Sequence, residues 1–192
     1  MSTILTSKLL APPRNEGLQK LAERWRPAGL FLGCLRADGA LLWHDPGMPR
    51  ALALCLTHMD LPRRHLEQAA PRSETPASMR LEPISGVEMH LVPVLRRRRV
   101  TAWLVIMART GIPHPTEELQ RAASRCSLDV TAILTPLLQV PLLTPAQLPV
   151  LVNLAAQMLD DQQLHLAAQQ ELFSITEQLS STYEEISLVY KI

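Results

Sequence analysis

The chemically capable side chains of this chain are few and widely spaced. Cys55 and His58 are close enough in sequence to share a metal ion, and His65 lies near them. A structural zinc site takes four protein ligands, and no matching Cys or His pair in the sequence completes such a set. We therefore expect a half-buried thiol and surface histidines here, and no metal site.

Paired carboxylates, which general acid–base catalysis uses, occur only between direct neighbours in the sequence. The pairs are Glu117 with Glu118, Asp160 with Asp161, and Glu184 with Glu185. Consecutive side chains of a helix do not face each other, so these pairs do not converge on one substrate. The sequence also lacks a glycine-rich phosphate loop and a Gly-x-Ser-x-Gly motif. We predict no catalytic residues and no enzymatic activity; an enzyme with an unrecognised site is one alternative.

Four residues on or near strand-like segments are candidates for a ligand pocket. Side chains that converge on the open face of a sheet are typical of small-molecule sites. Buried Cys and Trp are also ordinary core residues, so plain packing is the alternative. The candidate ligand-binding residues are Cys34, Trp43, His90 and Trp103. These residues indicate no particular cofactor.

The residues from Arg96 to Arg99 form a basic run between two strand-like segments. Such a run could bind phosphate or nucleic acid, but no aromatic residue interleaves with it to stack on bases. The whole chain has 19 basic and 18 acidic residues, a net charge of +1, so no general field attracts nucleic acid or membranes. We expect a solvated hairpin tip and no nucleic-acid partner.

The composition indicates what class of protein holds these residues. Hydrophobic residues make up 47% of the 192 residues, enough for one domain with a core plus an extension. The three scattered cysteines are not a disulfide framework and are typical of a reducing compartment. No apolar run approaches the roughly 18 residues of a membrane span, and the start lacks the apolar stretch of a signal peptide. We expect a cytoplasmic protein without a membrane partner.

The hydrophobic pattern predicts strands and helices in an α+β order. The strand-like segments are 30–35, 40–44, 87–94 and 100–108, and the helical segments are 15–26, 49–59, 62–70 and 116–137. The Asp38-Gly39 pair between the first two strands is a strong hairpin signal. Pro93 places its strand at a sheet edge or makes it bulge there, because proline donates no ladder hydrogen bond. A loop is predicted at 71–78. Clustered strands with helices lying on them predict an antiparallel sheet flanked by helices.

The last 43 residues carry the strongest pattern in the sequence. No proline or glycine follows Pro149, and apolar residues recur at alternating steps of three and four. The predicted dimer interface is Leu151, Leu154, Met158, His165, Leu172, Ile175, Leu179, Ile186 and Val189. This heptad pattern holds over about six heptads and predicts a long helix that forms a parallel dimeric coiled coil. A helix that folds back within one chain is the alternative.

Asp161 and His165 are polar exceptions within this seam. Polar seam positions weaken a coiled coil but fix its register. The pair is either a point where the helices change register or a solvated stretch where they have not yet met.

Several of these segments resemble GAF domains. The run Leu91-Val92-Pro93-Val94, the basic turn and residues 100–106 resemble the late GAF strands, and the hairpin around Asp38-Gly39 resembles the early ones. The segment 116–137 is similar to the final GAF helix, which leads into a signalling coiled coil. A PAS-like fold fits the strand count nearly as well. The tail at 175–190 is similar to connecting helices in bacterial sensor proteins, which precede phosphatase, kinase or cyclase outputs.

The resemblance implies a sensory domain followed by a signalling helix. The expected parts are an N-terminal tail at 1–14, a GAF-like domain at 15–138, a proline-rich linker at 139–149 and a coiled-coil helix at 150–192. We expect a regulatory module of a bacterial signal-transduction protein that forms a homodimer and relays a state change to an output domain. A small-molecule ligand, or a thiol such as Cys34 or Cys55, is the expected trigger. A structural dimerisation adaptor that binds no ligand is the alternative.

Overall fold

A computed structural model of the chain describes residues 15–69, 78–96 and 99–190. The predicted N-terminal tail, all but the last residue of the predicted loop at 71–78, and the middle of the basic turn lie outside the described residues. The chain divides into two compact units, Met1–Ala156 and Gln157–Ile192. The first unit holds a sheet and its helices, and the second is the remainder of the C-terminal helix and the chain end.

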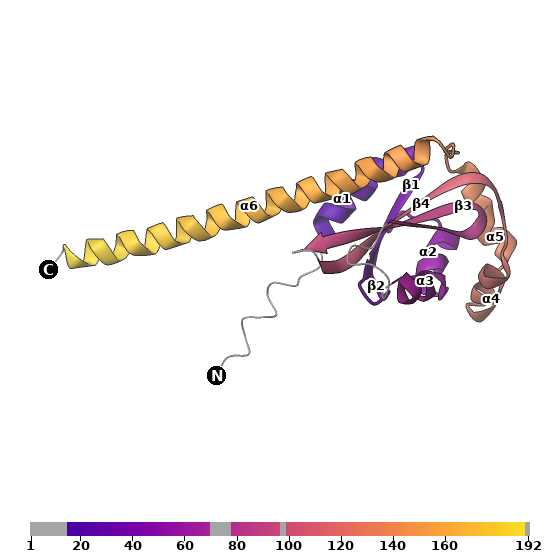
Figure 1. The fold of residues 1–192 in the computed structure, drawn as a ribbon, viewed down its shortest axis with the longest axis horizontal. Helices are drawn as coiled ribbons and strands as arrows, with labels where there is room; N and C mark the ends of the chain where they lie inside the picture. The colour runs from indigo at the N-terminus through magenta and orange to yellow at the C-terminus, as the bar shows by residue number, and fades with distance from the viewer. Residues whose placement is uncertain (1–14, 70–77, 97–98, 191–192) are drawn as a thin grey trace. The chain divides into compact units, whose positions relative to one another are not determined.

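The first unit is built on one antiparallel sheet, which confirms the predicted α+β fold (Figure 1). Its strands are β1 (Leu30–Arg36), β2 (Leu41–His44), β3 (Met79–Arg96) and β4 (Arg99–His114). The spatial order is β2-β1-β4-β3, so β3 lies at an edge, which is the first of the two alternatives that Pro93 predicts. β3 and β4 extend beyond the predicted segments, because the apolar run of β4 marks only its buried centre.

Asp38 and Gly39 close the hairpin between β1 and β2, as predicted. Gly39 has φ +84°, a left-handed conformation that glycine adopts without strain. Asp38 Oδ1 accepts hydrogen bonds from Arg36 Nε at 2.8 Å and from the backbone N–H of Ala40 at 3.0 Å. The bond from Arg36, followed by that from Ala40, lowers the pKa of Asp38 to about 2.

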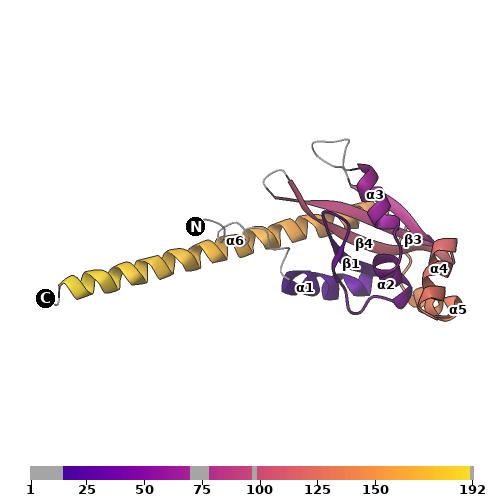
Figure 2. The ribbon, with the colours of Figure 1, turned by 90° about the horizontal axis from the view of Figure 1, so that it is seen from below.

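One face of the sheet is covered by four short helices (Figures 1 and 2). They are α2 (Arg50–Thr57), α3 (Leu61–Ala69), α4 (Glu117–Arg125) and α5 (Val130–Leu134). The predicted helices at 49–59 and 62–70 are thereby confirmed as α2 and α3. Phe31, Met89 and Met107 project from three adjacent strands into one hydrophobic cluster with Leu52 and Leu119 of these helices. Alternate residues of the strands face this side, since successive side chains of a strand point to opposite faces.

The opposite face is covered by helix α1 (Asn15–Trp25) and the first turns of α6 (Gln147–Val189) (Figure 1). A short 3-10 turn, η1 (Arg26–Ala28), joins α1 to β1. The buried residues of these helices lie outside the first cluster and form a second apolar layer with the remaining strand side chains. They are Leu18, Leu21, Ala22, Leu148, Val152 and Ala155 on the helices, and Leu30, Leu32, Leu104 and Ile106 on the strands.

The prediction of one continuous helix over 116–137 is wrong. The segment is broken into α4, α5 and a 3-10 helix, η2 (Thr135–Gln139). Ser127 has φ +54°, which a helix does not accommodate. Asp129 then caps α5 by accepting a hydrogen bond from the backbone N–H of Thr131 at 2.9 Å. The amphipathic period survives the break, because both short helices turn their apolar sides to the same core.

The long C-terminal helix is present as predicted. α6 spans 43 residues, which corresponds to about 65 Å at about 1.5 Å per residue. Pro149 lies in its first turn, where the missing N–H would have no intrahelical partner. The first turns of α6 belong to the first unit, and residues from Gln157 onward form the second.

Candidate functional site

The four predicted ligand-binding residues lie on the sheet but not on one face. Cys34 and Trp43 are opposite each other in the β1–β2 pair, so their side chains share a face. The strand registers place His90 of β3 on that same face. Trp103 pairs with Leu35 and faces the other side, in the cluster beneath α2. The sheet therefore brings three of these residues to one face and separates Trp103 from them.

Beside His90, the edge strand carries a buried carboxylate that the sequence reasoning missed. Glu88 is only 6% exposed. Its carboxylate accepts a hydrogen bond from Arg80 Nη2 at 2.7 Å, and its second oxygen lies 3.3 Å from His90 Nε2. The two-residue spacing of Glu88 and His90 on a strand was the available signal, because such residues share a face. Burying a carboxylate costs free energy unless its charge is paired. The ion pair with Arg80 offsets that cost at Glu88.

The two thiols considered as triggers, those of Cys34 and Cys55, are both buried. Burial raises the pKa of Cys34 to about 11 and that of Cys55 to about 12. The thiolate is the reactive form of cysteine, so both thiols are poor nucleophiles at neutral pH. Cys126, which follows α4, is only partly buried. The burial pattern thus favours Cys126 as the most accessible thiol and disfavours the two predicted ones.

A small hollow lies beside the end of α2, at α3 and α4. Its volume is about 40 Å³, which holds a few water molecules and is far below the roughly 300–1,000 Å³ of small-molecule pockets. Its polar lining consists of His58, Asp60, Arg64, Glu118, Arg121 and Arg125. Spacings of one helical turn within this lining, such as Asp60 with Arg64 and Arg121 with Arg125, are the signals that the sequence offered.

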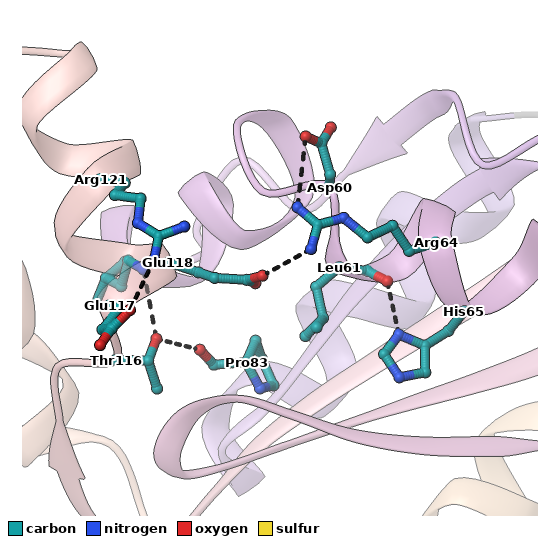
Figure 3. A network of polar contacts seen from close by, with 10 residues as sticks. Asp60, Leu61, Arg64, His65, Pro83, Thr116, Glu117, Glu118 and Arg121 are labelled. Carbon is teal, nitrogen blue, oxygen red and sulfur yellow. Dashed lines mark hydrogen bonds and ion pairs between the residues drawn. The ribbon is translucent and has the colours of Figure 1, made fainter.

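Two of the three arginines around this hollow, Arg64 and Arg121, are paired with carboxylates (Figure 3). Arg64 lies between two carboxylates, at 3.3 Å from Glu118 and 3.9 Å from Asp60. Arg121 donates to Glu117 over 2.7 Å. The pair of Arg64 with Glu118 joins α3 to α4, and carboxylates already engage the guanidinium groups of both Arg64 and Arg121.

A hydrogen bond fixes the start of α4 to strand β3 of the sheet (Figure 3). The hydroxyl of Thr116 donates to the carbonyl oxygen of Pro83 over 2.9 Å. It also accepts from the backbone N–H of Leu119, which caps α4. These bonds fix the N-terminus of α4, the helix that carries Glu118 and Arg121 of the hollow's lining.

The residues considered for zinc do not converge. Cys55 donates to the carbonyl oxygen of Ala51 at 3.2 Å, and His65 Nδ1 lies 2.9 Å from the carbonyl oxygen of Leu61. His58 is exposed, with Nδ1 at 2.6 Å from the hydroxyl of its neighbour Thr57. Across 15–69, 78–96 and 99–190, no group of three or more His, Cys, Asp or Glu side chains is placed to hold a metal ion.

Arg109 of β4 holds the segment that leads to α6. Its Nη1 donates to the carbonyl oxygens of Leu137 at 3.0 Å and Val140 at 3.1 Å, and also to that of Leu138. Its own backbone carbonyl accepts from the N–H of Leu143 at 2.9 Å. The positive guanidinium thus lies among the carbonyl groups at the end of η2, where a cation is favourable. This residue fixes the linker to the central sheet.

The predicted seam of α6 is largely uncovered. Leu172 and Leu179 are each 65% exposed. The further seam residues classed as exposed are Leu154, His165, Ile175 and Ile186, whereas Leu151 and Met158 are partly buried. Val152 and Ala155, which pack within the first unit, are each offset by one residue from a seam position, or about 100° around the helix. The side chain of Val189 is outside the described part of the chain.

Comparisons of this chain with protein-family models, with curated proteins and with solved structures find no match. None of the helices in the described part of the chain combines the length and apolar character needed to span a lipid bilayer. The class of protein that the structure defines is therefore an α+β domain with a four-stranded antiparallel sheet and a long C-terminal helix.

Proposed function

We propose that this chain is a dimerising regulatory module in which a GAF-like or PAS-like domain is coupled to a signalling helix. The observation that supports the proposal is the exposed seam of α6. Four large apolar side chains at heptad positions, Leu172, Ile175, Leu179 and Ile186, are exposed in the single chain. Covering one such side chain contributes about 1.5–3 kcal/mol, so a second copy of the helix is a strongly favourable partner.

A parallel, in-register pair suits the residues that flank the seam. In such a pair, the residue just before the first seam position of each heptad faces the residue five places further along the other helix. Glu171 then faces Thr176 of its twin, and Glu185 faces Tyr190. Neither of these two contacts sets a carboxylate against a carboxylate, although Asp161 within the seam faces Asp161 of its twin. The flanking contacts are compatible with the parallel arrangement that a relay to a following domain requires.

The connection between the domain and the helix supports a regulatory role. The first turns of α6 are part of the domain core through Leu148, Val152 and Ala155. Arg109 ties the preceding linker to β4, the central strand that pairs with both β1 and β3. A change in the sheet would therefore alter the position of the start of α6, and the paired helices would carry that change along their length.

Light scattering of the intact chain tests the dimer. We expect a dimeric mass for the wild type and a monomeric mass for Leu172→Asp combined with Leu179→Asp, because two carboxylates per chain would be buried in the seam. The matched control is Phe173→Asp with Ser180→Asp, which places the same charges one residue further along, outside the seam. Circular dichroism of all variants checks that the domain remains folded. A monomeric wild type, or equal loss of dimer in the control, contradicts the proposal.

A structural adaptor whose domain binds no ligand is the second candidate. The observation that favours it is the burial of the predicted ligand residues. Cys34 is buried on one face of the sheet and Trp103 on the other, each beneath helices. Thermal unfolding in the presence of a small-molecule metabolite library separates the candidates, because a ligand that binds the folded state raises its stability. Stabilisation that is lost in Trp43→Ala or His90→Ala favours sensing.

A further inference from the structure

Asp161 and His165 are the titratable residues within the apolar seam of α6. Both are exposed in the single chain, and both lie in the continuous helix of the second unit. They are about one helical turn apart, so they share a face of the helix, with Cβ atoms about 5–6 Å from each other. Each chain therefore presents a carboxylate and an imidazole side by side at seam positions.

A carboxylate at a seam position is unfavourable in a parallel pair. Asp161 takes the fourth position of its heptad and His165 the first position of the next, and each of these positions faces its own copy across an in-register pair. The two Asp161 carboxylates thus meet in the layer next to the two His165 rings. Like charges repel, and the lower dielectric between packed helices strengthens the repulsion. A cation held between the carboxylates would remove it.

The four facing side chains form a ligand set that one chain lacks. Across the described ranges of the single chain, no three His, Cys, Asp or Glu side chains are grouped to hold a metal ion. Paired helices lie about 8–10 Å apart, so two adjacent seam layers gather two carboxylates and two imidazoles around one point. The pair thereby supplies four ligands, which is the number that a closed zinc site takes.

The types of these ligands favour zinc over the hard cations. Imidazole nitrogen and carboxylate oxygen both bind Zn²⁺ at about 2.0–2.2 Å, in tetrahedral geometry. Ca²⁺ and Mg²⁺ prefer oxygen ligands and higher coordination numbers. The two carboxylates carry two negative charges and the bound imidazoles are neutral, so one Zn²⁺ leaves a centre without net charge in the seam.

Gln169 lies where it can orient the imidazole. A histidine that binds a metal through one ring nitrogen usually hydrogen-bonds through the other, which fixes the orientation of the ring. The side-chain Nε2 of Gln169 lies 3.3 Å from His165 Nε2. With Nδ1 of His165 on the metal, Nε2–H would donate to the amide oxygen of Gln169 once that amide had turned over.

We infer that Asp161 and His165 of two chains together bind one Zn²⁺ ion between the paired helices. The inference rests on the proposed parallel dimer, because each chain supplies half of the site. The ion fixes the register of the two helices shortly after Ala156, where the first unit ends. Because it binds the pair and not the single chain, zinc also strengthens the dimer by mass action.

Zinc titration of the intact chain tests the site. After removal of metal with EDTA and dialysis, calorimetry should show saturable binding of one Zn²⁺ per two chains. Co²⁺ in its place should give the intense visible absorption of a tetrahedral centre. Light scattering across a dilution series should show that Zn²⁺ lowers the dissociation constant of the dimer at least tenfold, whereas Mg²⁺ at the same concentration should leave it unchanged.

Matched variants locate the ion. Asp161→Asn and His165→Gln should each weaken zinc binding at least tenfold and abolish the effect of zinc on the dimer. Asp161→Asn should not weaken the metal-free dimer, because it removes the facing charges; this result separates a metal ligand from a residue that only supports the helix pair. The controls are Asp160→Asn, at an exposed carboxylate one position earlier, and Cys126→Ser, at the most accessible thiol. Both should leave zinc binding unchanged.

The outcomes for the zinc site and for the dimer are distinguishable. A dimer that takes up no zinc, or that binds zinc equally in the wild type, Asp161→Asn and His165→Gln, overturns the site and leaves the proposed dimer standing. A dissociation constant that zinc does not alter overturns the site as well. A chain that stays monomeric with and without zinc contradicts the proposed dimer and, with it, the site.

Discussion

Arg109 Nη1 on β4 donates a hydrogen bond over 3.1 Å to the carbonyl oxygen of Val140, the residue that ends η2. The same guanidinium also donates through Nε to the carbonyl oxygen of Gly111 at 3.2 Å. One side chain on the central sheet therefore satisfies several carbonyl groups of the segment that leads to α6. The prolines of this segment restrict its φ angles but donate no hydrogen bonds, so the bonds to Arg109 are what join it to β4.

Replacement of Arg109 should release this linker. For Arg109→Met we expect a loss of about 2–4 kcal/mol in the free energy of unfolding, because charge-assisted hydrogen bonds to carbonyl groups are lost together. Arg109→Lys keeps the charge but cannot reach as many acceptors, so its loss should be smaller. Urea unfolding measures both. Hydrogen exchange at the amides of Val140 and Leu143 should accelerate in Arg109→Met. Unchanged exchange there would contradict the conclusion that Arg109 holds this segment against β4.

Two ion pairs of the sheet should differ strongly in importance. Arg80 pairs with buried Glu88, whereas Arg36 pairs with exposed Asp38. We expect Arg80→Ala to lower the free energy of unfolding by about 1–3 kcal/mol, because it leaves a buried carboxylate without its cation. Arg36→Ala should have a small effect, as exposed pairs are screened by water. Thermal unfolding of both variants at neutral pH is the measurement, and equal losses would argue against the burial of Glu88.

A glycine at a register shift within the edge strand β3 should not tolerate a side chain. Gly86 has φ +77°, and a Cβ atom there would lie 2.5 Å from the carbonyl oxygen of Ile112. We expect Gly86→Ala to cost about 2 kcal/mol or more through strain and a backbone clash. Gly111→Ala is the control, because its Cβ would meet only the Cα of Gly86 at 3.2 Å. Chemical unfolding should rank the two variants in that order.

The buried thiol of Cys34 should make stability depend on alkaline pH. Burial raises its pKa from 9.0 to about 11, so the folded state favours the protonated thiol. This contribution is fully present below pH 9 and is lost as pH rises towards 11. Two pKa units correspond to about 2–3 kcal/mol. The difference in the free energy of unfolding between the wild type and Cys34→Ala should therefore become smaller between pH 8 and 11. Urea unfolding under reducing conditions measures it, and Cys126→Ala is the control. A constant difference between wild type and Cys34→Ala would contradict the burial.

The sequence by itself determined the elements that depend on local chemistry. Asp38 and Gly39 specify a hairpin, and the absence of proline and glycine after Pro149 permits one long helix. Pro93 restricts its strand to a sheet edge or a bulge. Each of these outcomes follows from backbone geometry or from a short repeat, which neighbouring residues fix among themselves. The apolar heptad positions of α6 could also be predicted from the sequence, because their spacing does not depend on the rest of the fold.

Only the tertiary structure decided which distant residues meet. Strand register decides that Glu88 pairs with Arg80 and that Trp103 and Cys34 lie on opposite faces. The packing of η2 beside β4 decides that Arg109 donates to the carbonyl groups of that 3-10 helix. The break after α4 shows the same limit, since an amphipathic period persists across two short helices that share one core. Sequence periodicity records that a side chain is buried, but the contacts across the core determine what it is buried against.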